Sequence, residues 1–317
     1  MTLSIYSWLR DSGVLGMNRR NAEYIMRQNP RTAYPLADDK LLTKRLAVEH
    51  GLPTPALLHV IQYHGDMATL DEALKGSSEF AVKPARGAGG SGIILIAGRN
   101  EQGFVKQSNE VVSFEELHYA ISDILSGVYS LEGREDRVLI EALVHPDPVF
   151  ASVTFRGVPD IRIVVYKGVP AMAMTRLPTQ KSDGKANLHR GAIGVGIDMG
   201  SGTTTSGVNG TSLIDRHPDT GGKVSGISVP YWEEMLLIAA KAVDMTSLGY
   251  LGVDLIIDRE KGPLLLELNA RPGLQIQVAN QSGLKKRLDL IDDASSHVFV
   301  SPEARVAWAR DAFTREP

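Results

Sequence analysis

Three stretches of this sequence consist of two apolar runs joined by a short polar or glycine-rich turn, which is the pattern of antiparallel β-hairpins. They are residues 77–98, 160–178 and 252–273, and the second turns at Lys167-Gly168. No regular alternation of strand, helix and strand runs through the chain, which disfavours the parallel sheets of Rossmann and P-loop proteins. The sequence therefore predicts an α+β fold with mostly antiparallel sheets.

Helical patterns separate the hairpins. Asp38 or Asp39 can cap one helix, and the Ser-x-x-Glu pattern of Ser113 and Glu116 begins another. Shorter helix-like pieces fill residues 1–37. We expect long helices over 38–51, 113–130 and 229–246, and further strands over 57–65 and 137–144.

Composition excludes several classes of function. The 317 residues carry a net charge of −3, so neither nucleic acid nor a membrane surface is an expected partner. The chain has no cysteine, which rules out thiol catalysis, thiolate metal sites and disulfides. No apolar run reaches the length of a membrane span, and the first residues lack the pattern of a signal peptide. We therefore expect a cytoplasmic protein without membrane insertion.

The last hairpin carries a candidate metal site. A loop of two or four residues centred on Glu260-Lys261 would place Asp254 directly opposite Glu267, with Asn269 on the same face. Two carboxylates about 5 Å apart repel each other unless a cation lies between them. Oxygen ligands of this kind suit Mg²⁺, which borrows further oxygens from a substrate phosphate. The alternative is a solvated polar face, and a three-residue loop would break the register.

The hairpin at 77–98 carries a candidate phosphate site. Lys83 directly precedes the glycine-rich turn at 84–92, whose backbone N–H groups can approach phosphate oxygens. The turn is not a Walker A motif, because no Gly-Lys-Ser/Thr follows and no helix begins there. Lys40, in the first turn of its helix, opposes the helix dipole, and a bound phosphate would compensate for it. The alternative is a flexible hairpin tip.

The stretch GIDMGSGTTTSG, residues 196–207, is similar to the phosphate-binding hairpin of actin-like ATPases. Such proteins need that hairpin near the start of a large domain, whereas here it begins at residue 196 of 317. We therefore expect Asp198 and Thr203–Thr205 to form a hairpin turn and a returning strand.

Six segments, in this order, resemble the ATP-grasp superfamily, specifically its alpha-L-glutamate ligase-like (RimK-type) branch. They are DDKLLTKRLAVEHGLPTP, FAVKPARGAGGSGI, VLIEALV, DIRIVVYKG, KANLHRGA and GVDLIID followed by GPLLLELNARPG. The resemblance runs from about Asp38 to Leu290. It implies an ATP-grasp fold, in which two α+β subdomains clasp ATP after a short helical segment. The implied divisions are 1–37, 38–143 and 144–317.

The resemblance also implies residues that bind the cofactors. Lys40 and Lys83 would reach the phosphates of ATP, and the glycine-rich turn would cover them. The residues of this flap are Gly87, Gly89, Gly90, Ser91 and Gly92. Those beside the adenine edge would be Glu141, Ala142, Leu143 and Val144. Asp254, Glu267 and Asn269 would hold one or two Mg²⁺ ions, with Mn²⁺ as an alternative.

The family's reaction activates a carboxylate as an acyl phosphate, which an amine then displaces to give an amide. The resemblance thus implies a carboxylate–amine ligase, with glutamate or another amino acid as a candidate substrate. The residues that would clamp the carboxylate and the phosphoryl group are Arg162, Arg176, Arg190 and Arg271, with Asn187 beside them. Two alternatives stay open: a phosphotransferase that acts on a small molecule, and a nucleotide-binding regulatory protein without turnover.

The chain departs from the glutamate ligases in two places. A longer excursion at 192–228 resembles a sugar-transfer-associated ATP-grasp subgroup, and only about 38 residues precede Lys40. Those residues are too few to form a substrate-binding domain with its own core. We therefore expect the excursion, a partner protein or another copy in a homo-oligomer to complete the site. The substrates are expected to be small-molecule or peptide carboxylates and amines.

Overall fold

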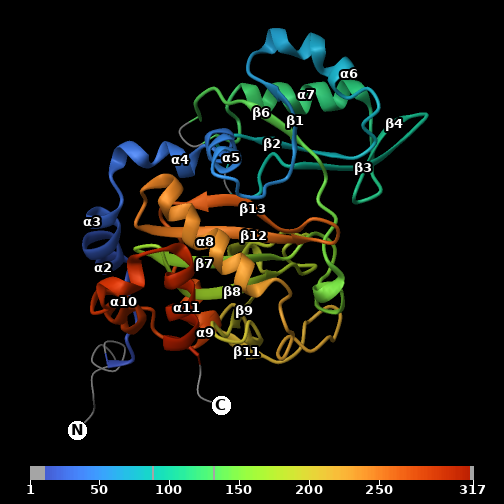
Figure 1. Ribbon diagram of the computed structural model, residues 1–317. Helices are drawn as coiled ribbons and strands as arrows, with labels where there is room; N and C mark the ends of the chain where they lie inside the picture. Colours follow the sequence, from blue (N-terminus) through green and yellow to red (C-terminus); the bar gives the residue numbers. More distant parts are fainter. Residues whose placement is uncertain (1–10, 88, 131–132, 315–317) are drawn as a thin grey trace. The chain divides into compact units, whose positions relative to one another are not determined.

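The computed structural model describes residues 11–87, 89–130 and 133–314, and these divide into two compact units (Figure 1). Unit 1 comprises Met1–Asp38, Leu46–Pro53 and Pro146–Pro317. Unit 2 comprises Asp39–Arg45 and Thr54–His145. Each unit has its own sheet and its own hydrophobic core.

Unit 2 is built on a six-stranded sheet in the order β1-β6-β2-β3-β4-β5, and every described pair in it is antiparallel. Its strands are β1 (Leu57–Ile61), β2 (Phe80–Pro84), β3 (Ile94–Asn100), β4 (Gly103–Lys106), β5 (Val111–Val112) and β6 (Val138–Glu141). Its helices are α6 (Leu70–Ala73), α7 (Phe114–Leu125) and the first residues of α5 (Lys40–Glu49), with a 3-10 turn at His64–Thr69.

The two faces of this sheet carry different side chains. Phe80 and Val82 of β2 pack into the main core with Leu117 and Ile121 of α7, which covers that face (Figure 1). Successive side chains of a strand point to opposite faces, so Lys83 points away from this core. Leu41 of α5 forms a small separate cluster on the other side. The sheet therefore presents a lysine to the face that α5 covers.

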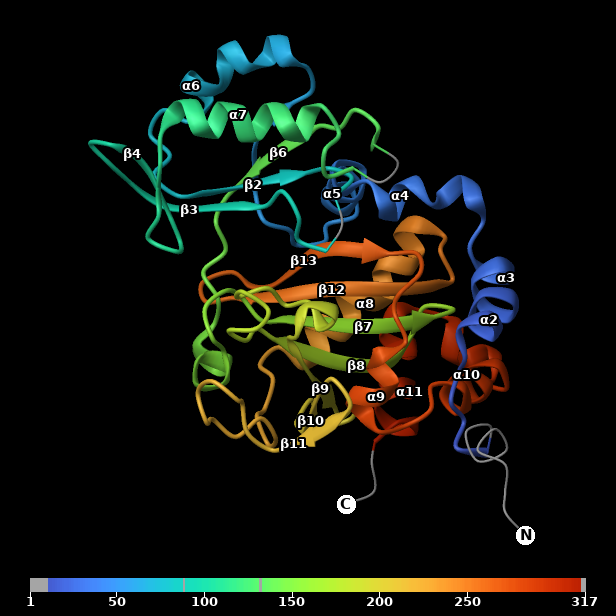
Figure 2. The same ribbon diagram turned by 180° about the vertical axis from the view of Figure 1, so that it is seen from behind.

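Unit 1 is built on a seven-stranded antiparallel sheet in the order β11-β10-β9-β8-β7-β12-β13 (Figure 2). Its strands are β7 (Asp160–Tyr166), β8 (Val169–Leu177), β9 (Ile193–Ile197), β10 (Thr204–Asn209), β11 (Ser212–Ile214), β12 (Tyr250–Asp258) and β13 (Gly262–Asn269). Its helices are α2 (Met17–Arg19), α3 (Met26–Gln28), α4 (Pro35–Asp38), α8 (Trp232–Thr246), α9 (Gln275–Asn280), α10 (Lys285–Asp292) and α11 (Pro302–Ala312). Helix α8 packs on β7, β8 and β12, and a π-helical turn at Arg20–Ile25 joins α2 to α3.

The expected α+β architecture with antiparallel sheets is confirmed, as are the three hairpins. Lys167 and Gly168 both have positive φ angles, of 49° and 80°, as a two-residue hairpin turn requires. Ser113 and Glu116 form the expected capping box. The expected helix at 38–51 is interrupted, because Asp39 lies between α4 and α5 and its carboxylate accepts the N–H groups of Leu41 and Leu42. The first residues of the expected segment 1–37 lie outside the described residues.

The expected loop length of the last hairpin was wrong, but the expected register of its carboxylates is confirmed. Asp258 pairs with Gly262, so the loop has three residues rather than two or four. Leu255 pairs with Leu265 while Asp254 pairs with Glu267, so Leu266 is a one-residue bulge in β13. Without this bulge Leu266 would oppose Asp254. The bulge compensates for the odd loop and returns Glu267 to the face of Asp254.

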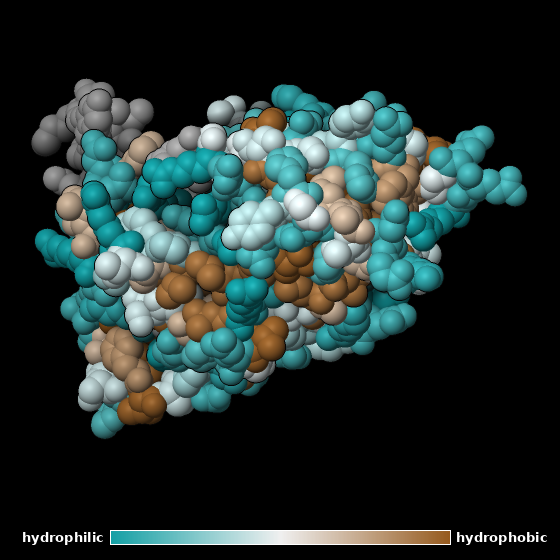
Figure 3. All heavy atoms as spheres, turned by 90° about the horizontal axis from the view of Figure 1, so that it is seen from above, coloured by the Kyte–Doolittle hydropathy of each residue, from teal (hydrophilic) through white to brown (hydrophobic). Residues whose placement is uncertain are grey.

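Hydrophilic side chains cover most of the face shown in Figure 3, with hydrophobic ones gathered near its centre. Among the helices of the described chain, none combines the length and the apolar composition that crossing a membrane would require.

Candidate functional site

In unit 2, two lysines converge on one buried glutamate. Glu141 of β6 is 3% exposed, and its carboxylate accepts the ammonium of Lys83 at 2.7 Å and that of Lys44 at 2.9 Å. Lys83 lies on the neighbouring strand β2, and Lys44 lies on α5, where it also donates to the carbonyl of Pro55. Two ammonium groups against one carboxylate leave this lysine cluster, Lys44, Lys83 and Glu141, with a formal surplus of positive charge.

The pKa values of the lysine cluster reflect burial and pairing together. Burial alone would raise the pKa of Glu141, but Lys83 and Lys44 outweigh it and hold that pKa below its usual value. For Lys44, burial lowers the pKa, and the attraction of Glu141 only partly offsets this effect. Glu141 is therefore ionised at neutral pH, and burial opposes the positive charge of Lys44.

Lys40 and the glycine-rich turn are held together by direct contacts. The ammonium of Lys40 donates to the carbonyl of Gly87 at 2.6 Å, and its backbone N–H donates to Ala85. Gly89, Gly90 and Gly92 all have positive φ angles, which favour glycine. A Cβ at Gly92 would lie 2.7 Å from the ring of Tyr129. The turn thus lies beside the ammonium of Lys40. Its backbone adopts positive φ angles that residues with a side chain rarely adopt.

The segment after β6 is only half-buried. The N–H of Ala142 donates to the carbonyl of Ala56 at 2.8 Å, so this N–H already has a partner within unit 2. Leu143 and Val144 continue the chain without regular secondary structure. Their role beside an adenine edge stays a prediction.

In unit 1, charged side chains form a row across four neighbouring strands, β8, β7, β12 and β13. Arg176 pairs with Asp160 across β8 and β7, and Arg162 faces Asp254 across β7 and β12. Glu267 faces Asp254 from β13. The row of charges, as we call it, consists of Arg176, Asp160, Arg162, Asp254 and Glu267. Cross-strand neighbours of this kind interact directly, so the sheet itself assembles the cluster.

Asp254 is the centre of this row. It is 1% exposed, and its carboxylate accepts Arg162 Nε at 2.6 Å and Arg176 Nη2 at 2.8 Å. The amide of Asn269 donates to the same carboxylate at 3.3 Å. Arg176 also donates through its Nε to Asp160 at 2.6 Å. Three strands thus supply the partners of one buried carboxylate.

Burial alone would raise the pKa of Asp254, but Arg162 and Arg176 outweigh it and hold that pKa well below its usual range. Burial raises the pKa of Asp160 to about 6, because the attraction of Arg176 is opposed by the repulsion of Asp254. For Arg176, burial works against the charge, but the two carboxylates raise its pKa above the usual value.

Asp254, Glu267 and Asn269 of β12 and β13 carry oxygen donors of the kind that magnesium prefers. Three carboxylates oppose two guanidiniums in the row, so the row has a formal surplus of one negative charge. Among the described residues, no three acidic or histidine side chains could hold a metal ion together. Two carboxylates and the amide oxygen of Asn269 are an incomplete oxygen set, which suits an ion that keeps waters and binds substrate oxygens.

The remaining candidate residues lie outside the row. The side chain of Asn187 caps a 3-10 turn at Leu188–Arg190 by accepting the N–H of His189 at 3.0 Å. Arg190 is exposed. Arg271 is also exposed and stacks over the ring of Tyr34 at 4.9 Å. In the structure as described, Asn187 and Arg271 thus have partners of their own.

The excursion is anchored to the loop that carries Asn187 and Arg190. His217, at 1% exposure, lies with its Nε2 2.9 Å from the carbonyl of Pro178, where that loop begins. The N–H groups of Asp219 and Thr220 point at its Nδ1, so Nδ1 is the acceptor and Nε2 carries the hydrogen. The carboxylate of Asp219 accepts the N–H of Gln180 at 2.7 Å. The excursion therefore braces the start of this loop.

The stretch 196–207 is a hairpin, as expected. It comprises the end of β9, a turn and the first four residues of β10. Asp198 accepts the N–H and the hydroxyl of Ser201, both at 2.8 Å, and so stabilises the turn. The neighbouring Thr204 donates its hydroxyl to the carbonyl of Val224.

Sequence reasoning missed two members of these clusters, Lys44 and Asp160. Lys44 is four residues after Lys40, so the two lie on the same side of α5. Asp160 is two residues before Arg162 and therefore on the same face of β7. Helical and strand periodicity could have found both.

Three solved structures resemble this chain at low sequence identity. The ATP-grasp ligase PsnB bound to a minimal precursor is 14% identical, with a TM-score of 0.42 over 88% of this chain and 62% of that chain. The D-cycloserine synthetase DcsG is 15% identical, with a TM-score of 0.46 over 83% and 72%. The D-alanine–D-alanine ligase from Bacillus anthracis, in complex with ATP, is 16% identical, with a TM-score of 0.44 over 88% and 69%. The chain thus spans less than two thirds of PsnB.

A search of curated proteins found no match. The sequence profile of one family, described as sugar-transfer associated ATP-grasp, matches residues 19–293. This range includes both units' charged clusters as well as the excursion. The match supports the sugar-transfer subgroup and does not specifically support the glutamate ligase-like branch. Glutamate as a substrate of this chain stays a prediction. The chain has the ATP-grasp fold and belongs to the sugar-transfer-associated ATP-grasp family.

Proposed function

We propose that this chain is an ATP- and Mg²⁺-dependent ligase that joins a carboxylate to an amine. The observation that carries the proposal is the row of charges, which surrounds one buried carboxylate with two arginines, a second carboxylate and an amide. Phosphoryl transfer needs positioning and charge neutralisation more than it needs a protein nucleophile, and the row supplies both.

Each unit by itself carries groups that suit one part of this chemistry. Lys83 and Lys40 would hold phosphate oxygens of ATP, with the glycine-rich turn beside Lys40. Asp254, Glu267 and Asn269 would hold Mg²⁺, which neutralises phosphate charge when bound. Arg162 and Arg176 have further guanidinium N–H groups, which suit the planar oxygens of a substrate carboxylate.

The reaction would proceed in two balanced steps. A carboxylate oxygen of the first substrate attacks the γ-phosphorus of ATP, and the bond to the β-phosphate oxygen breaks to release ADP. An amine then attacks the acyl carbon, loses a proton and displaces inorganic phosphate, which leaves an amide. We propose amino acids, glutamate among them, as the first substrates to examine. Arg190 and Asn187 would contact the substrate from their braced loop.

A hydroxylamine trap tests this proposal. The protein is incubated with Mg-ATP, a pool of amino acids and other small carboxylates, and hydroxylamine, which converts an acyl phosphate into a stable hydroxamate. We expect ADP and hydroxamate to rise together, and both to fall to background in Glu267→Gln. The matched control is Glu260→Gln, at the exposed tip of the same hairpin, which should retain activity.

The other outcomes discriminate between the alternatives. ADP without hydroxamate, with a phosphorylated small molecule in its place, would identify a phosphotransferase. Absence of ADP, together with tight binding of ATP, would support a nucleotide-binding protein without turnover. Full activity in Glu267→Gln would contradict the magnesium assignment.

A further inference from the structure

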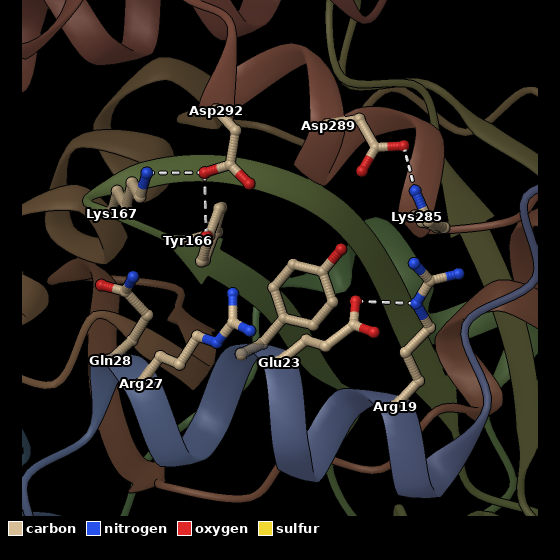
Figure 4. Close-up of a pocket in the computed structure, with 10 residues that line it drawn as sticks. Arg19, Glu23, Arg27, Gln28, Tyr166, Lys167, Lys285, Asp289 and Asp292 are labelled. Carbon is tan, nitrogen blue, oxygen red and sulfur yellow. Dashed lines mark hydrogen bonds and ion pairs between the residues drawn. The ribbon is translucent and has the colours of Figure 1, made fainter.

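A polar cavity of about 350 Å³ lies in unit 1, apart from the row of charges (Figure 4). Its walls come from three segments that are distant in sequence: the helical run from α2 to α3, the turn between β7 and β8, and α10. Tyr166 lines it and lies four residues along β7 from Arg162, a separation of about 13 Å. The cavity is large enough for a small metabolite.

The wall formed by Tyr24 and Tyr166 contains a hydroxyl group without a partner. The rings of Tyr24 and Tyr166 pack edge to face, with centroids 5.4 Å apart. The hydroxyl of Tyr166 donates to Asp292 at 2.9 Å, whereas no described residue hydrogen-bonds the hydroxyl of Tyr24. Tyr24 is only 4% exposed, and it lines the cavity. Because Tyr24 lines the cavity and no described residue bonds its hydroxyl, this group can form a hydrogen bond with a bound ligand.

The Tyr24 hydroxyl is a hydrogen-bond donor at neutral pH. Burial, together with the carboxylates of Asp289 and Glu23, raises the pKa of Tyr24 to about 12. Both carboxylates line the same cavity. This side of the cavity therefore offers one hydroxyl and two acidic groups to amino or hydroxyl groups of a ligand.

The opposite side of the cavity offers a positive charge. The other three cations of the lining are paired: Arg19 with Glu23, Lys167 with Asp292, and Lys285 with Asp289. The guanidinium of Arg27 makes no hydrogen bond or ion pair with any residue that the structure describes. Figure 4 shows Arg27 and Gln28 on the same side as Lys167, away from Asp289. Four cations and three carboxylates thus leave one positive charge for an anionic group.

We propose that this cavity binds a small carboxylate that also carries amino or hydroxyl groups. Its carboxylate accepts the guanidinium of Arg27, with the amide of Gln28 beside it. Its amino or hydroxyl groups meet the hydroxyl of Tyr24 and the carboxylates of Glu23 and Asp289. Amino acids and sugar acids share this chemistry. The assignment does not depend on the ligase function, because no residue of the row of charges lines the cavity.

Isothermal titration calorimetry on the full chain tests the site, with L-glutamate, D-glucuronate and succinate as probes and without ATP. We expect L-glutamate or D-glucuronate to bind more tightly than succinate, which has a carboxylate at each end but no amino or hydroxyl group. Arg27→Gln should weaken this binding about tenfold, or about 1.4 kcal/mol. Tyr24→Phe keeps the ring and should weaken it about fivefold. The matched control Arg31→Gln changes an exposed arginine of the same segment outside the lining and should bind as the wild type does.

The probes also distinguish the two classes of ligand. Binding of L-glutamate alone supports an amino acid, and binding of D-glucuronate alone supports a sugar acid. The proposal is overturned if neither binds at concentrations up to about 10 mM, a limit that lies near −3 kcal/mol. It is equally overturned if Arg27→Gln leaves the affinity unchanged, or if succinate binds as tightly as the other two.

Discussion

The charged clusters of the two units have formal net charges of opposite sign and contain different cations. The lysine cluster of unit 2 sets two ammonium groups around Glu141, whereas the row of charges in unit 1 sets three carboxylates against two guanidiniums. The first balance suits phosphate oxygens, and the second suits a metal ion. The two clusters thus favour ligands of opposite charge.

The two kinds of cation also respond differently when their partner is lost. A buried lysine can release its proton and become neutral, whereas an arginine stays charged at any pH that a protein tolerates. The pKa of Lys44 is already lowered by burial, while that of Arg176 is raised by its two carboxylates. We therefore expect equivalent substitutions in the two clusters to have unequal costs.

The largest effect is expected from Asp254→Asn. It removes the charge that two largely buried guanidiniums share, and it should lower the free energy of unfolding by about 3–5 kcal/mol. Urea denaturation followed by circular dichroism measures this loss. Asp293→Asn, at an exposed site of the same unit, is the control. A loss below about 1 kcal/mol, the scale of a surface ion pair, would show that the row of charges contributes little to stability.

Glu141→Gln should lower the free energy of unfolding by a smaller amount, about 1–3 kcal/mol near pH 7, because Lys44 can release its proton. The folded-state pKa of Lys44 lies below the unfolded value, so the unfolded state binds more protons between the two values. Stability therefore rises with pH in that window. The Glu141→Gln variant should regain part of its loss as the pH approaches about 10, the ordinary pKa of lysine.

The same urea experiment on Asp254→Asn sharpens the comparison. The two arginines that lose this carboxylate stay charged, so stability should not recover at high pH. Equal recovery in both variants would contradict the difference between the clusters.

In the wild type, the pKa of Glu141 is lowered, so the contribution of this carboxylate to stability is fully present above its ordinary pKa. That contribution is lost as the pH falls through the folded-state pKa.

Lys83→Ala should weaken binding of ATP about tenfold, or about 1.4 kcal/mol, if the surplus positive charge of the lysine cluster binds phosphate oxygens. Titration with a fluorescent ATP analogue measures the dissociation constant. Lys75→Ala is the matched control, because that lysine belongs to unit 2 and is 76% exposed. Equal affinity of wild type and Lys83→Ala would remove the lysine cluster from the nucleotide site.

The smallest of these effects should come from His217→Ala, outside both clusters. Loss of the bond from Nε2 to Pro178 should speed amide exchange in residues 178–191 about fivefold, or about 1 kcal/mol, without changing exchange in β12. Hydrogen–deuterium exchange with mass spectrometry measures both regions at once. Unchanged exchange in the loop would mean that the excursion does not brace it.

Much of the fold followed from local patterns in the sequence. The hairpin around Lys167-Gly168 and the capping box at Ser113 depend on residues a few positions apart, and the structure confirms both. The register of Asp254 and Glu267 is also confirmed, although the assumed loop length was wrong. A bulge depends on packing along the whole strand, so its position at Leu266 could not be derived from turn residues alone.

The candidate site was predictable only in part. Asp254, Glu267 and Lys83 were identified from hairpin patterns, but their partners come from segments far away in the chain. The distance from Lys44 to Glu141 is 97 residues, and that from Arg162 to Asp254 is 92. Which strand neighbours which is set by the sheet order, and no local pattern encodes it. Periodicity places Lys44 on the side of Lys40 and Asp160 on the face of Arg162, but their pairing with Glu141 and Arg176 depends on this long-range order.

The bulge at Leu266 divides the last hairpin into two sections that follow separate registers. Between the tip and the bulge, residues 255–258 pair with residues 262–265 in the register that the three-residue loop sets. Beyond the bulge, residues 252–254 pair with residues 267–269, shifted by one position. The tip at residues 259–261 is consequently separated from Asp254 and Glu267 by the bulge and by the pairs that Leu255–Asp258 form. A change in the tip would therefore disturb these pairs before it reached the two carboxylates. A graft or an insertion at the tip, such as a peptide tag, would test how much length variation a hairpin can absorb before its ion-binding end is displaced.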